Sequence, residues 1–331
     1  MNINELNWLL GFLSSVIGVL GFFAVLSKKA LHLIWQLLPH WFVALFHKKS
    51  LDNPFIAGHF VYCNQFIGRK AVLRRVIGQI KTVQNVAIWG ESYIGKTSLL
   101  KTIERLGTEK CQEYIKNTYK IELPDLESYH FIYVNFRDIR FRNQTRFLQH
   151  IINQLELDEQ DILSLPEDET ESLALFCDIL TDNLKNSTII LLDNIEAALE
   201  HDFSATDFWD ALRSLSTSML DNHCLGFILT STQNPQHFEF EGNSSKFFNI
   251  FGDVIHLDAF SEAESKQLMA LSPKKFKDVD SKFILEHSQN KPLFLQILCY
   301  ELYEAMCEGE TCNTWQDKAL QKISEIPSQD A

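Results

Sequence analysis

Eight consecutive residues of the chain could wrap around a phosphate group. They read Gly90-Glu91-Ser92-Tyr93-Ile94-Gly95-Lys96-Thr97 and fit the pattern G-x-x-x-x-G-K-[ST]. The two glycines allow a tight backbone turn whose amide groups point inward at an anion. Lys96 would place its charge on the β- and γ-phosphates, Thr97 would offer its hydroxyl to Mg²⁺, and Ser98 would lie near the α-phosphate. The pattern predicts a nucleoside triphosphate site; the alternative is a chance match that binds no nucleotide.

The residues on either side of this loop support the prediction. Residues 86–89 are an apolar strand candidate, and residues 97–106 have helical spacing. A helix that begins at the loop adds the partial positive charge of its N-terminus to the anion site.

A second acidic element follows an apolar run at residues 188–192. Asp193 ends this run and would hold Mg²⁺ beside the phosphate loop. Glu196 is a candidate to polarise the attacking water, although it could equally be an exposed carboxylate in the first turn of a helix. Thr230, Ser231 and Asn234 follow another apolar run, where they could sense the γ-phosphate or simply form a turn.

The order of the apolar runs predicts the architecture. Strand candidates at 86–89, 131–136, 188–192, 226–230 and 254–257 alternate with helical patterns at 97–106, 145–155 and 208–220. This alternation predicts a parallel α/β sheet, and we assign it to residues 51–260. Helical patterns at 261–271, 281–288 and 292–307 predict a small helical subdomain over 261–331, and the acidic stretch 156–171 reads as a solvated loop.

The N-terminal region predicts a membrane anchor at residues 1–30. Residues 8–26 carry no charge and are almost long enough to span the hydrocarbon core, with a buried core helix as the alternative. Lys28 and Lys29 follow the span, so the positive-inside rule places the rest of the chain in the cytoplasm. Residues 31–50, with Trp35 and Trp41, predict an interfacial helix, and a second span is the alternative. We therefore expect a single-pass protein of the inner, cytoplasmic membrane.

Composition narrows the classes of function. The 331 residues are 46% hydrophobic and 22% charged, which excludes whole-chain disorder. The formal net charge of −13 disfavours a nucleic-acid partner. Seven scattered cysteines fit a reducing compartment better than a disulfide framework.

The cluster Arg137, Arg140 and Arg142 could reach a neighbour's nucleotide as an arginine finger, or form a solvated loop.

Taken together, the chain resembles the STAND-like AAA-type P-loop ATPases of bacteria and archaea over about residues 53–319. The segments that carry the resemblance, besides the phosphate loop, are 53–58 (NPFIAG), 66–69 (FIGR), 135–138 (NFRD), 192–196 (LDNIE) and 291–296 (KPLFLQ). The resemblance implies a five-stranded parallel sheet followed by a helical lid. It further implies that Phe66, Gly68 and Arg69 lie near adenine and that Pro292 opens a lid helix beside the nucleotide.

ATP and Mg²⁺ are the ligands that this resemblance implies, and members commonly act as molecular switches. Two departures make fast turnover doubtful: Thr230-Ser231-Thr232-Gln233 replaces the arginine that often follows the fourth strand, and Asn194 stands where many relatives carry the catalytic glutamate. We expect a membrane-anchored ATP-binding switch with slow hydrolysis, a homo-oligomer formed through the ATPase domain and an unidentified protein partner. A non-hydrolysing nucleotide-binding scaffold is the alternative. A DNA-handling ATPase is disfavoured because the chain is acidic and no winged-helix segment follows the lid.

Overall fold

The computed structural model describes residues 53–126, 129–155, 165–200, 203, 206–218, 224–238, 246–309 and 314–327. The predicted anchor at 1–30 and the predicted interfacial helix at 31–50 lie outside this part of the chain. Among the residues that the structure describes, none of the helices is both long and apolar enough to cross a membrane.

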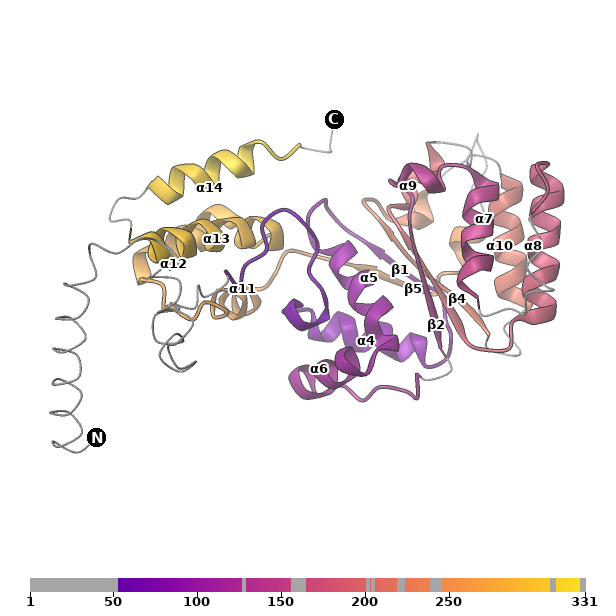
Figure 1. The fold of residues 1–331 in the computed structure, drawn as a ribbon, viewed down its shortest axis with the longest axis horizontal. Coiled ribbons are helices and arrows are strands. Elements are labelled where there is room, and N and C mark those ends of the chain that lie inside the picture. Colours follow the sequence, from indigo (N-terminus) through magenta and orange to yellow (C-terminus); the bar gives the residue numbers. More distant parts are fainter. Residues whose placement is uncertain are drawn as a thin grey trace, which may run out of the picture. The chain divides into compact units, whose positions relative to one another are not determined.

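Five parallel strands form one sheet in the order β2–β3–β4–β1–β5 (Figure 1). The strands are β1 (Val86–Trp89), β2 (His130–Asn135), β3 (Thr188–Asp193), β4 (Leu225–Ser231) and β5 (Asp253–His256). The predicted five-stranded parallel sheet is therefore confirmed. Every residue of β3 and β4 is buried, as expected of central strands that are covered on both faces.

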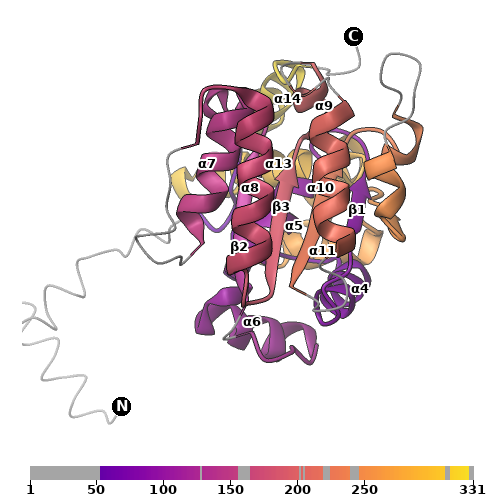
Figure 2. The ribbon, with the colours of Figure 1, turned by 90° about the vertical axis from the view of Figure 1, so that its right-hand side faces the viewer.

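Helices cover both faces of the sheet (Figure 2). One face packs on α4 (Lys70–Ile80), α5 (Lys96–Glu104) and α6 (Glu109–Tyr119). The other packs on α7 (Gln144–Gln154), α8 (Glu169–Asn183), α9 (Ile195–Leu199) and α10 (Thr206–Ser218). Alternate residues of β3 supply the two cores: Ile190 and Leu192 enter the α7–α10 side, whereas Ile189 and Leu191 enter the α4–α6 side.

Aromatic rings dominate the core on the α7–α10 side. The ring of Phe147 in α7 lies 5.4 Å from that of Phe136, 5.7 Å from that of Phe203 and 5.5 Å from that of Phe208. Phe136 follows β2 directly, so this cluster fixes the chain at the point where it leaves the sheet.

A helical subdomain with its own core follows the sheet. It consists of α11 (Glu262–Met269), α12 (Asp278–Ser288), α13 (Pro292–Glu308) and α14 (Thr314–Ser324). Ser261 and Glu264 form a capping box that starts α11, and Pro292 occupies the first turn of α13, where its missing N–H costs nothing. Phe55 packs in this helical core, with its ring 5.9 Å from that of Phe276 and 6.3 Å from that of Tyr303.

Several helices were not expected from the sequence. The helices α4, α6 and α14 had no prediction, and α8 begins at Glu169, inside the stretch 156–171 that we expected to be a loop. The first turn of α8 is acidic, which is why we expected a solvated loop there. Asp168 caps the helix by accepting the N–H of Glu171 at 2.9 Å. Phe176 and Leu180 then bury its inner face. Residues 156–164 lie outside the described part of the chain.

The cysteines also differ from expectation. Cys63 and Cys111 form a disulfide, although the sequence suggested separate thiols in a reducing compartment. The two residues are 48 positions apart, so sequence spacing carries no sign of the pairing. The bond joins η1 (Cys63–Gln65) to α6.

The aromatic core predicts the effect of one truncation. Phe147→Ala should lower the free energy of unfolding by about 3–5 kcal/mol, because it leaves a cavity among rings that cannot collapse into it. Urea unfolding of the full-length chain measures this. Arg146→Ala, an exposed neighbour on the same helix, should change it by about 0.5 kcal/mol or less; equal losses in both variants would contradict the packing described here.

Candidate nucleotide-binding site

The phosphate loop lies between β1 and α5, as the sequence predicts. Tyr93 and Gly95 both have positive φ, +65° and +98°, and these two residues turn the chain into the helix. A Cβ added to Gly90 would meet the carbonyl oxygen of Leu257 at 2.5 Å, so this position accepts no larger residue without movement of the backbone. The loop is therefore built around its two glycines.

Lys96 holds a buried positive charge inside the loop. Lys96 is only 7% exposed. Its Nζ donates to the carbonyl oxygens of Gly90 at 2.6 Å and Glu91 at 2.8 Å. Burial lowers the pKa of Lys96 to about 8, although the nearby carboxylates of Glu196 and Asp193 oppose that shift. A desolvated ammonium of this kind suits a phosphate, which would restore its preference for the charged form.

Asp193 is fully buried, and three hydroxyl groups donate to its carboxylate. Thr97 Oγ1 lies 2.8 Å from Oδ2, the Tyr133 hydroxyl lies 2.7 Å from the same oxygen, and Thr230 Oγ1 donates to Oδ1. The structure thus brings together Thr97 and Asp193, the two residues predicted to hold Mg²⁺. Two oxygen groups at this separation fit the ligand preference of that ion.

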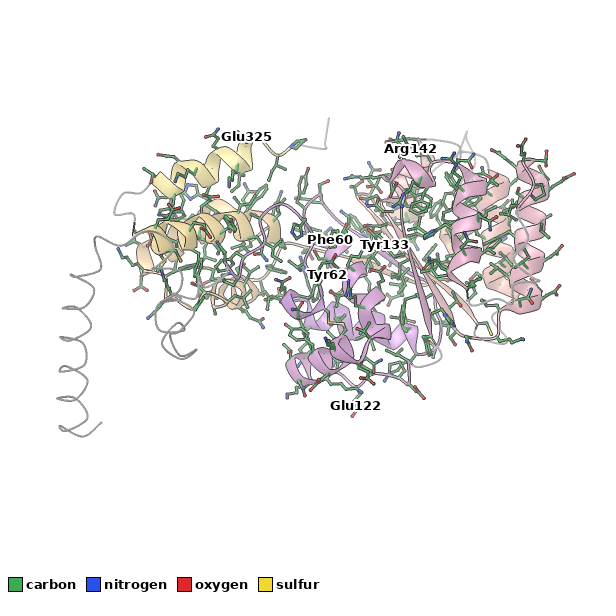
Figure 3. The ribbon with its side chains drawn as sticks, viewed as in Figure 1. Phe60, Tyr62, Glu122, Tyr133, Arg142 and Glu325 are labelled. Atoms are coloured by element: carbon green, nitrogen blue, oxygen red, sulfur yellow. A yellow bond between two sulfur atoms is a disulfide. The ribbon has the colours of Figure 1, made fainter. Side chains whose placement is uncertain are left out.

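Tyr133 is a member of this network that the sequence analysis missed. Burial and the neighbouring Asp193 carboxylate raise the pKa of its phenol, so it donates rather than ionises. The Lys101 ammonium lies 3.2 Å from the centre of the Tyr133 ring and 5.9 Å from the centre of the Phe60 ring. Figure 3 labels Tyr133 and Phe60. The only signal in the sequence was its position near the end of an apolar strand.

Glu196 lies in the first turn of α9, but its carboxylate is not exposed. Both carboxylate oxygens are buried, and neither has a hydrogen-bond partner among the described residues. Burial raises the pKa of Glu196, while the charges of Lys96 and Arg137 oppose this shift. The alternative of a solvent-facing carboxylate is wrong; a poorly solvated carboxylate beside the loop suits proton transfer.

Asn194 has a structural role between these two acids. It adopts a left-handed conformation with φ +58°, which starts α9. Its Nδ2 donates to Asn135 Oδ1 at 3.0 Å, and its backbone N–H donates to Thr230 Oγ1 at 3.1 Å. Asn194 therefore ties the ends of β2, β3 and β4 together.

The polar residues at the end of β4 and just after it separate into two roles. Thr230 supports Asp193, as described above. The Ser231 hydroxyl donates to the carbonyl oxygen of Gln233 at 2.5 Å, and the Asn234 side chain caps η5 (Pro235–His237) by accepting from the N–H of Gln236 at 3.0 Å. The turn interpretation holds for Ser231 and Asn234, and Thr232 lines the cavity instead.

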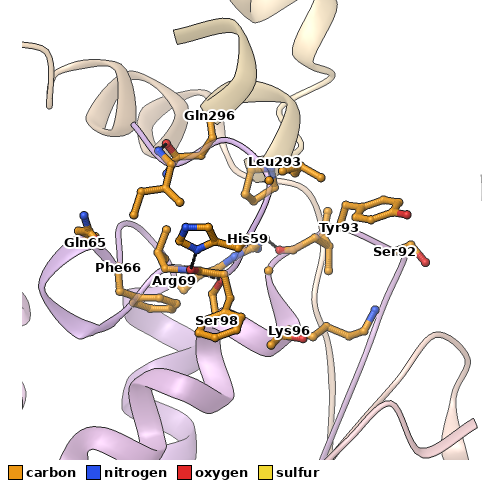
Figure 4. A pocket seen from close by; sticks show the side chains of 18 of the residues that line it. His59, Gln65, Phe66, Arg69, Ser92, Tyr93, Lys96, Ser98, Leu293 and Gln296 are labelled. Carbon is orange, nitrogen blue, oxygen red and sulfur yellow. Dashed lines mark hydrogen bonds between the residues drawn. The ribbon is translucent and has the colours of Figure 1, made fainter. Parts of the chain in front are cut away.

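A cavity of about 300 Å³ opens beside the loop, between the sheet and the helical lid (Figure 4). Loop residues Ser92, Tyr93, Ile94, Gly95, Lys96, Thr97 and Ser98 line it together with Phe66, Ile67 and Arg69. Pro292, Leu293 and Gln296 line it from α13, which begins at Pro292 as expected. The volume suits a nucleotide-sized ligand.

Arg69 and Gly68 have different places in this cavity. Arg69 lines it and donates from Nη2 to the carbonyl oxygen of Ile94 at 3.0 Å, while its guanidinium stacks 4.7 Å from the centre of the Phe260 ring. Gly68 is not among the lining residues. It packs on Glu264, whose Oε1 would lie 2.9 Å from an added Cβ. Gly68 shapes the segment rather than facing a ligand.

Gln296 is a second residue whose role the sequence did not specify. It is buried, and its Oε1 accepts the N–H of Ile56 at 2.9 Å, so the lid helix is joined to the segment before β1. On the other side of the cavity the hydroxyl groups of Tyr114 and Tyr119 donate to the carbonyl oxygen of Phe66 at 3.1 Å and 2.6 Å. The Phe66 segment is thereby held on the core, opposite the lid.

Two contacts join the phosphate loop to the C-terminal subdomain. The Lys291 ammonium lies 2.8 Å from Glu91 Oε2, and it lowers the pKa of that carboxyl group. The Tyr93 hydroxyl donates to the carbonyl oxygen of Pro327 at 3.1 Å. Both loop residues precede Lys96, so a ligand that moves the loop would act on these contacts.

Residues 77–237 match the family model described as an AAA domain. The chain carries an AAA-type P-loop ATPase domain. Its sheet is that of an α/β P-loop NTPase, and such a domain implies nucleotide and usually Mg²⁺, which the buried Lys96 and the Thr97–Asp193 pair fit. The STAND-like assignment remains a prediction. No curated protein sequence matches the chain significantly.

Solved structures of other proteins show a similar fold. The Aeropyrum pernix ORC1 protein, solved in complex with DNA, matches with a TM-score of 0.53 and 13% identity, covering 78% of this chain and 66% of that one. The ORC2 protein of the same organism, solved with ADPNP and ADP, matches with a TM-score of 0.54 and 14% identity over 79% and 68% of the two chains. The Walker-type ATPase paby2304 of Pyrococcus abyssi matches with a TM-score of 0.54 and 12% identity over 82% and 75%. At these identities the likeness concerns the fold alone.

The position of Lys96 in the loop predicts that Lys96→Ala weakens Mg·ATP binding by about 100-fold or more, because the charge-assisted hydrogen bonds that its ammonium would donate to the phosphates are worth about 1.5–3 kcal/mol each. Titration calorimetry on the full-length chain measures this change. Lys110→Ala removes an exposed lysine from α6 and should leave affinity unchanged. Unaltered affinity in Lys96→Ala would mean that the nucleotide binds elsewhere.

Proposed function

We propose that this protein is a membrane-anchored switch that binds Mg·ATP and hydrolyses it slowly. One arrangement carries the proposal: Thr97, which follows the buried Lys96, is hydrogen-bonded to Asp193 at 2.8 Å, and the buried carboxylate of Glu196 is near enough to Lys96 to oppose the lowering of its pKa. This arrangement places a phosphate-binding cation, a metal-ligand pair and a buried carboxylate at the phosphate loop, and Lys96 and Thr97 line the cavity itself. The reaction would be ATP + H₂O → ADP + phosphate.

Each residue has a defined part in this reaction. Lys96 would hold the β- and γ-phosphates, and Thr97 and Asp193 would hold Mg²⁺, which neutralises charge on the phosphates when bound. Glu196 would accept a proton from the attacking water as the water oxygen bonds to the γ-phosphorus. The bond from that phosphorus to the bridging oxygen breaks, the electron pair stays on ADP, and Glu196 later returns its proton to solvent.

The switch rests on the contacts between loop and lid. A ligand shifts a conformational equilibrium only by its different affinity for the two states. The Lys291–Glu91 ion pair and the Tyr93–Pro327 hydrogen bond join the phosphate loop to the C-terminal subdomain, so they are the contacts through which bound phosphate would move the lid. A homo-oligomer or an unidentified protein partner would respond to that movement.

A non-hydrolysing scaffold is the second candidate, and Asn194 is the observation that favours it. The Asn194 amide is hydrogen-bonded to Asn135. The position directly after Asp193 therefore carries no carboxylate that could accept a proton from water. A DNA-handling role is not proposed, since the net charge of −13 disfavours it and the DNA bound by the A. pernix ORC1 protein belongs to that protein.

Turnover by a Glu196→Gln variant separates the two candidates. Turnover should fall by about 10²–10⁴-fold while Mg·ATP affinity stays within about threefold, because glutamine keeps the shape but accepts no proton. Phosphate release and calorimetry on the full-length chain measure both. Glu200→Gln, an exposed position just after the same helix, is the matched control and should match the wild type.

The same base gives wild-type turnover a pH dependence. Only the carboxylate form of Glu196 accepts a proton, and burial raises the pKa of this group, so turnover should be lost as pH falls through that raised pKa and recovered as pH rises. The residual rate of Glu196→Gln should lack this acidic limb. Tight Mg·ATP binding with no turnover in wild type or variant would instead favour the scaffold.

The membrane anchor is a proposal that rests on the sequence of residues 8–26. The full-length chain should stay with carbonate-washed membranes and require detergent for release. Leu20→Arg, which places a charge near the centre of the run at a cost of about 2.5–3.5 kcal/mol, should reduce that retention. Recovery of the wild-type chain in the soluble fraction without detergent would contradict the anchor.

A further inference from the structure

The γ-phosphate carries more negative charge than the Lys96 ammonium alone can balance. Lys96 supplies one cation, and the end of β4 with the two residues after it reads Thr230-Ser231-Thr232-Gln233, which contains no basic residue. Thr230 is committed to Asp193 and Ser231 to Gln233, so the end of β4 offers only the Thr232 side chain to the cavity. Phosphoryl transfer is accelerated strongly by a second cation at the transferred group.

Arg137, from the loop after β2, brings such a cation to the cavity. It lines the cavity together with Lys96, Asn194 and Thr232, at the carboxyl ends of the central strands. Its positive charge lowers the pKa of both Lys96, which also lines the cavity, and the buried Glu196. Arg69 also lines the cavity, but it lies beside Ile94 and Phe260, where its guanidinium donates to the Ile94 carbonyl oxygen and stacks on the Phe260 ring.

The backbone that carries Arg137 is held in place by its neighbours. Its N–H donates to Asn135 Oδ1 at 3.0 Å, and the same oxygen accepts the Asn194 amide at 3.0 Å. The N–H of Phe136 donates to the carbonyl oxygen of Asp193 at 3.1 Å, and the Phe136 ring is fully buried in the aromatic core. These hydrogen bonds hold the loop to Asp193 and Asn194. The Arg137 side chain therefore extends from a backbone position that is fixed.

The other arginines of this loop have different places. The Arg140 guanidinium forms an ion pair with Asp138 at 2.5 Å, and neither Arg140 nor Arg142 is among the residues that line the cavity. Only one member of the cluster predicted from the sequence therefore faces the site. That site belongs to its own chain, whereas an arginine finger would be supplied to a neighbour's nucleotide.

We propose that Arg137 contacts the γ-phosphate of the nucleotide bound to its own chain and stabilises the charge that develops there during hydrolysis. It replaces, from the end of β2, the arginine that the sequence lacks after β4. The contact exists only with a triphosphate, so Arg137 also distinguishes ATP from ADP. This inference rests on the proposed ATPase function.

The test compares Arg137→Ala, Arg137→Lys and the matched control Arg140→Ala in the full-length chain, with Mg²⁺ present. Arg137→Ala should lower kcat by about 100-fold or more. It should weaken binding of the β,γ-imido analogue of ATP by about tenfold and that of ADP by less than about twofold. Arg137→Lys should lie between, since it keeps the charge without the planar fork. Arg140→Ala should resemble the wild type.

The outcomes separate this inference from the proposed function. If the wild type hydrolyses ATP and Arg137→Ala keeps both its turnover and its preference for the analogue over ADP, the role of Arg137 is overturned and the ATPase stands. If the wild type does not turn over but Arg137→Ala still loses that preference, hydrolysis fails and the γ-phosphate contact stands. Mixing Arg137→Ala with Lys96→Ala should restore no turnover; restoration would show that the arginine acts on a neighbour and overturn the assignment to its own chain.

Discussion

The buried carboxylate of Asp193 is the interaction around which this site is arranged. A charge without water must be compensated by hydrogen bonds, and here three hydroxyl groups supply them. Thr97 comes from α5, Tyr133 from β2 and Thr230 from β4, so one carboxylate connects the phosphate loop with the strands on either side of β3. Thr97 is also an expected metal ligand. Mg²⁺ would therefore bind oxygen atoms that are already held close together by the hydrogen bond between Thr97 and Asp193.

The site gathers charges that the fold buries at one edge of an otherwise apolar sheet. Lys96 and Asp193 are less than a tenth exposed, and the carboxylate oxygens of Glu196 are buried without partners among the described residues. Burial pushes both Lys96 and Glu196 toward their neutral forms. Such an arrangement lowers the stability of the ligand-free protein, and it makes the binding of a polyanion with its metal the natural compensation.

The two sides of the cavity are attached to different cores. The Phe66 segment is fixed to α6 by two tyrosine hydroxyl groups and by the nearby Cys63–Cys111 disulfide. Pro292 and Gln296, on the other side, belong to a helix that packs in the core of the lid. A ligand between them therefore touches residues from two hydrophobic cores, which meet at Ile67 and at the hydrogen bond from the Arg69 N–H to Glu264. This is the physical condition under which binding can change their relative position.

The sequence by itself determined the phosphate loop, the Asp193 strand, the alternation of strands and helices, and Pro292 at the start of a lid helix. These follow from local rules: glycines at fixed spacing, buried strands made mostly of apolar residues, and a proline at a helix start. The expected roles of Lys96, Thr97 and Asp193 depend only on residue type and on the end of the strand where they stand, so these residues could be named in advance.

Only the tertiary structure decided which distant residues meet. Tyr133 reaches Asp193 across the parallel pairing of β2 with β3, and Cys63 meets Cys111 across 48 positions of sequence. The burial of Glu196 also depends on packing, since the same residue in the first turn of an isolated helix would face water. Arg137 enters the cavity because Phe136 is anchored in a core of rings that lie far apart in the chain. Long-range packing sets these positions, and no local pattern in the sequence encodes them.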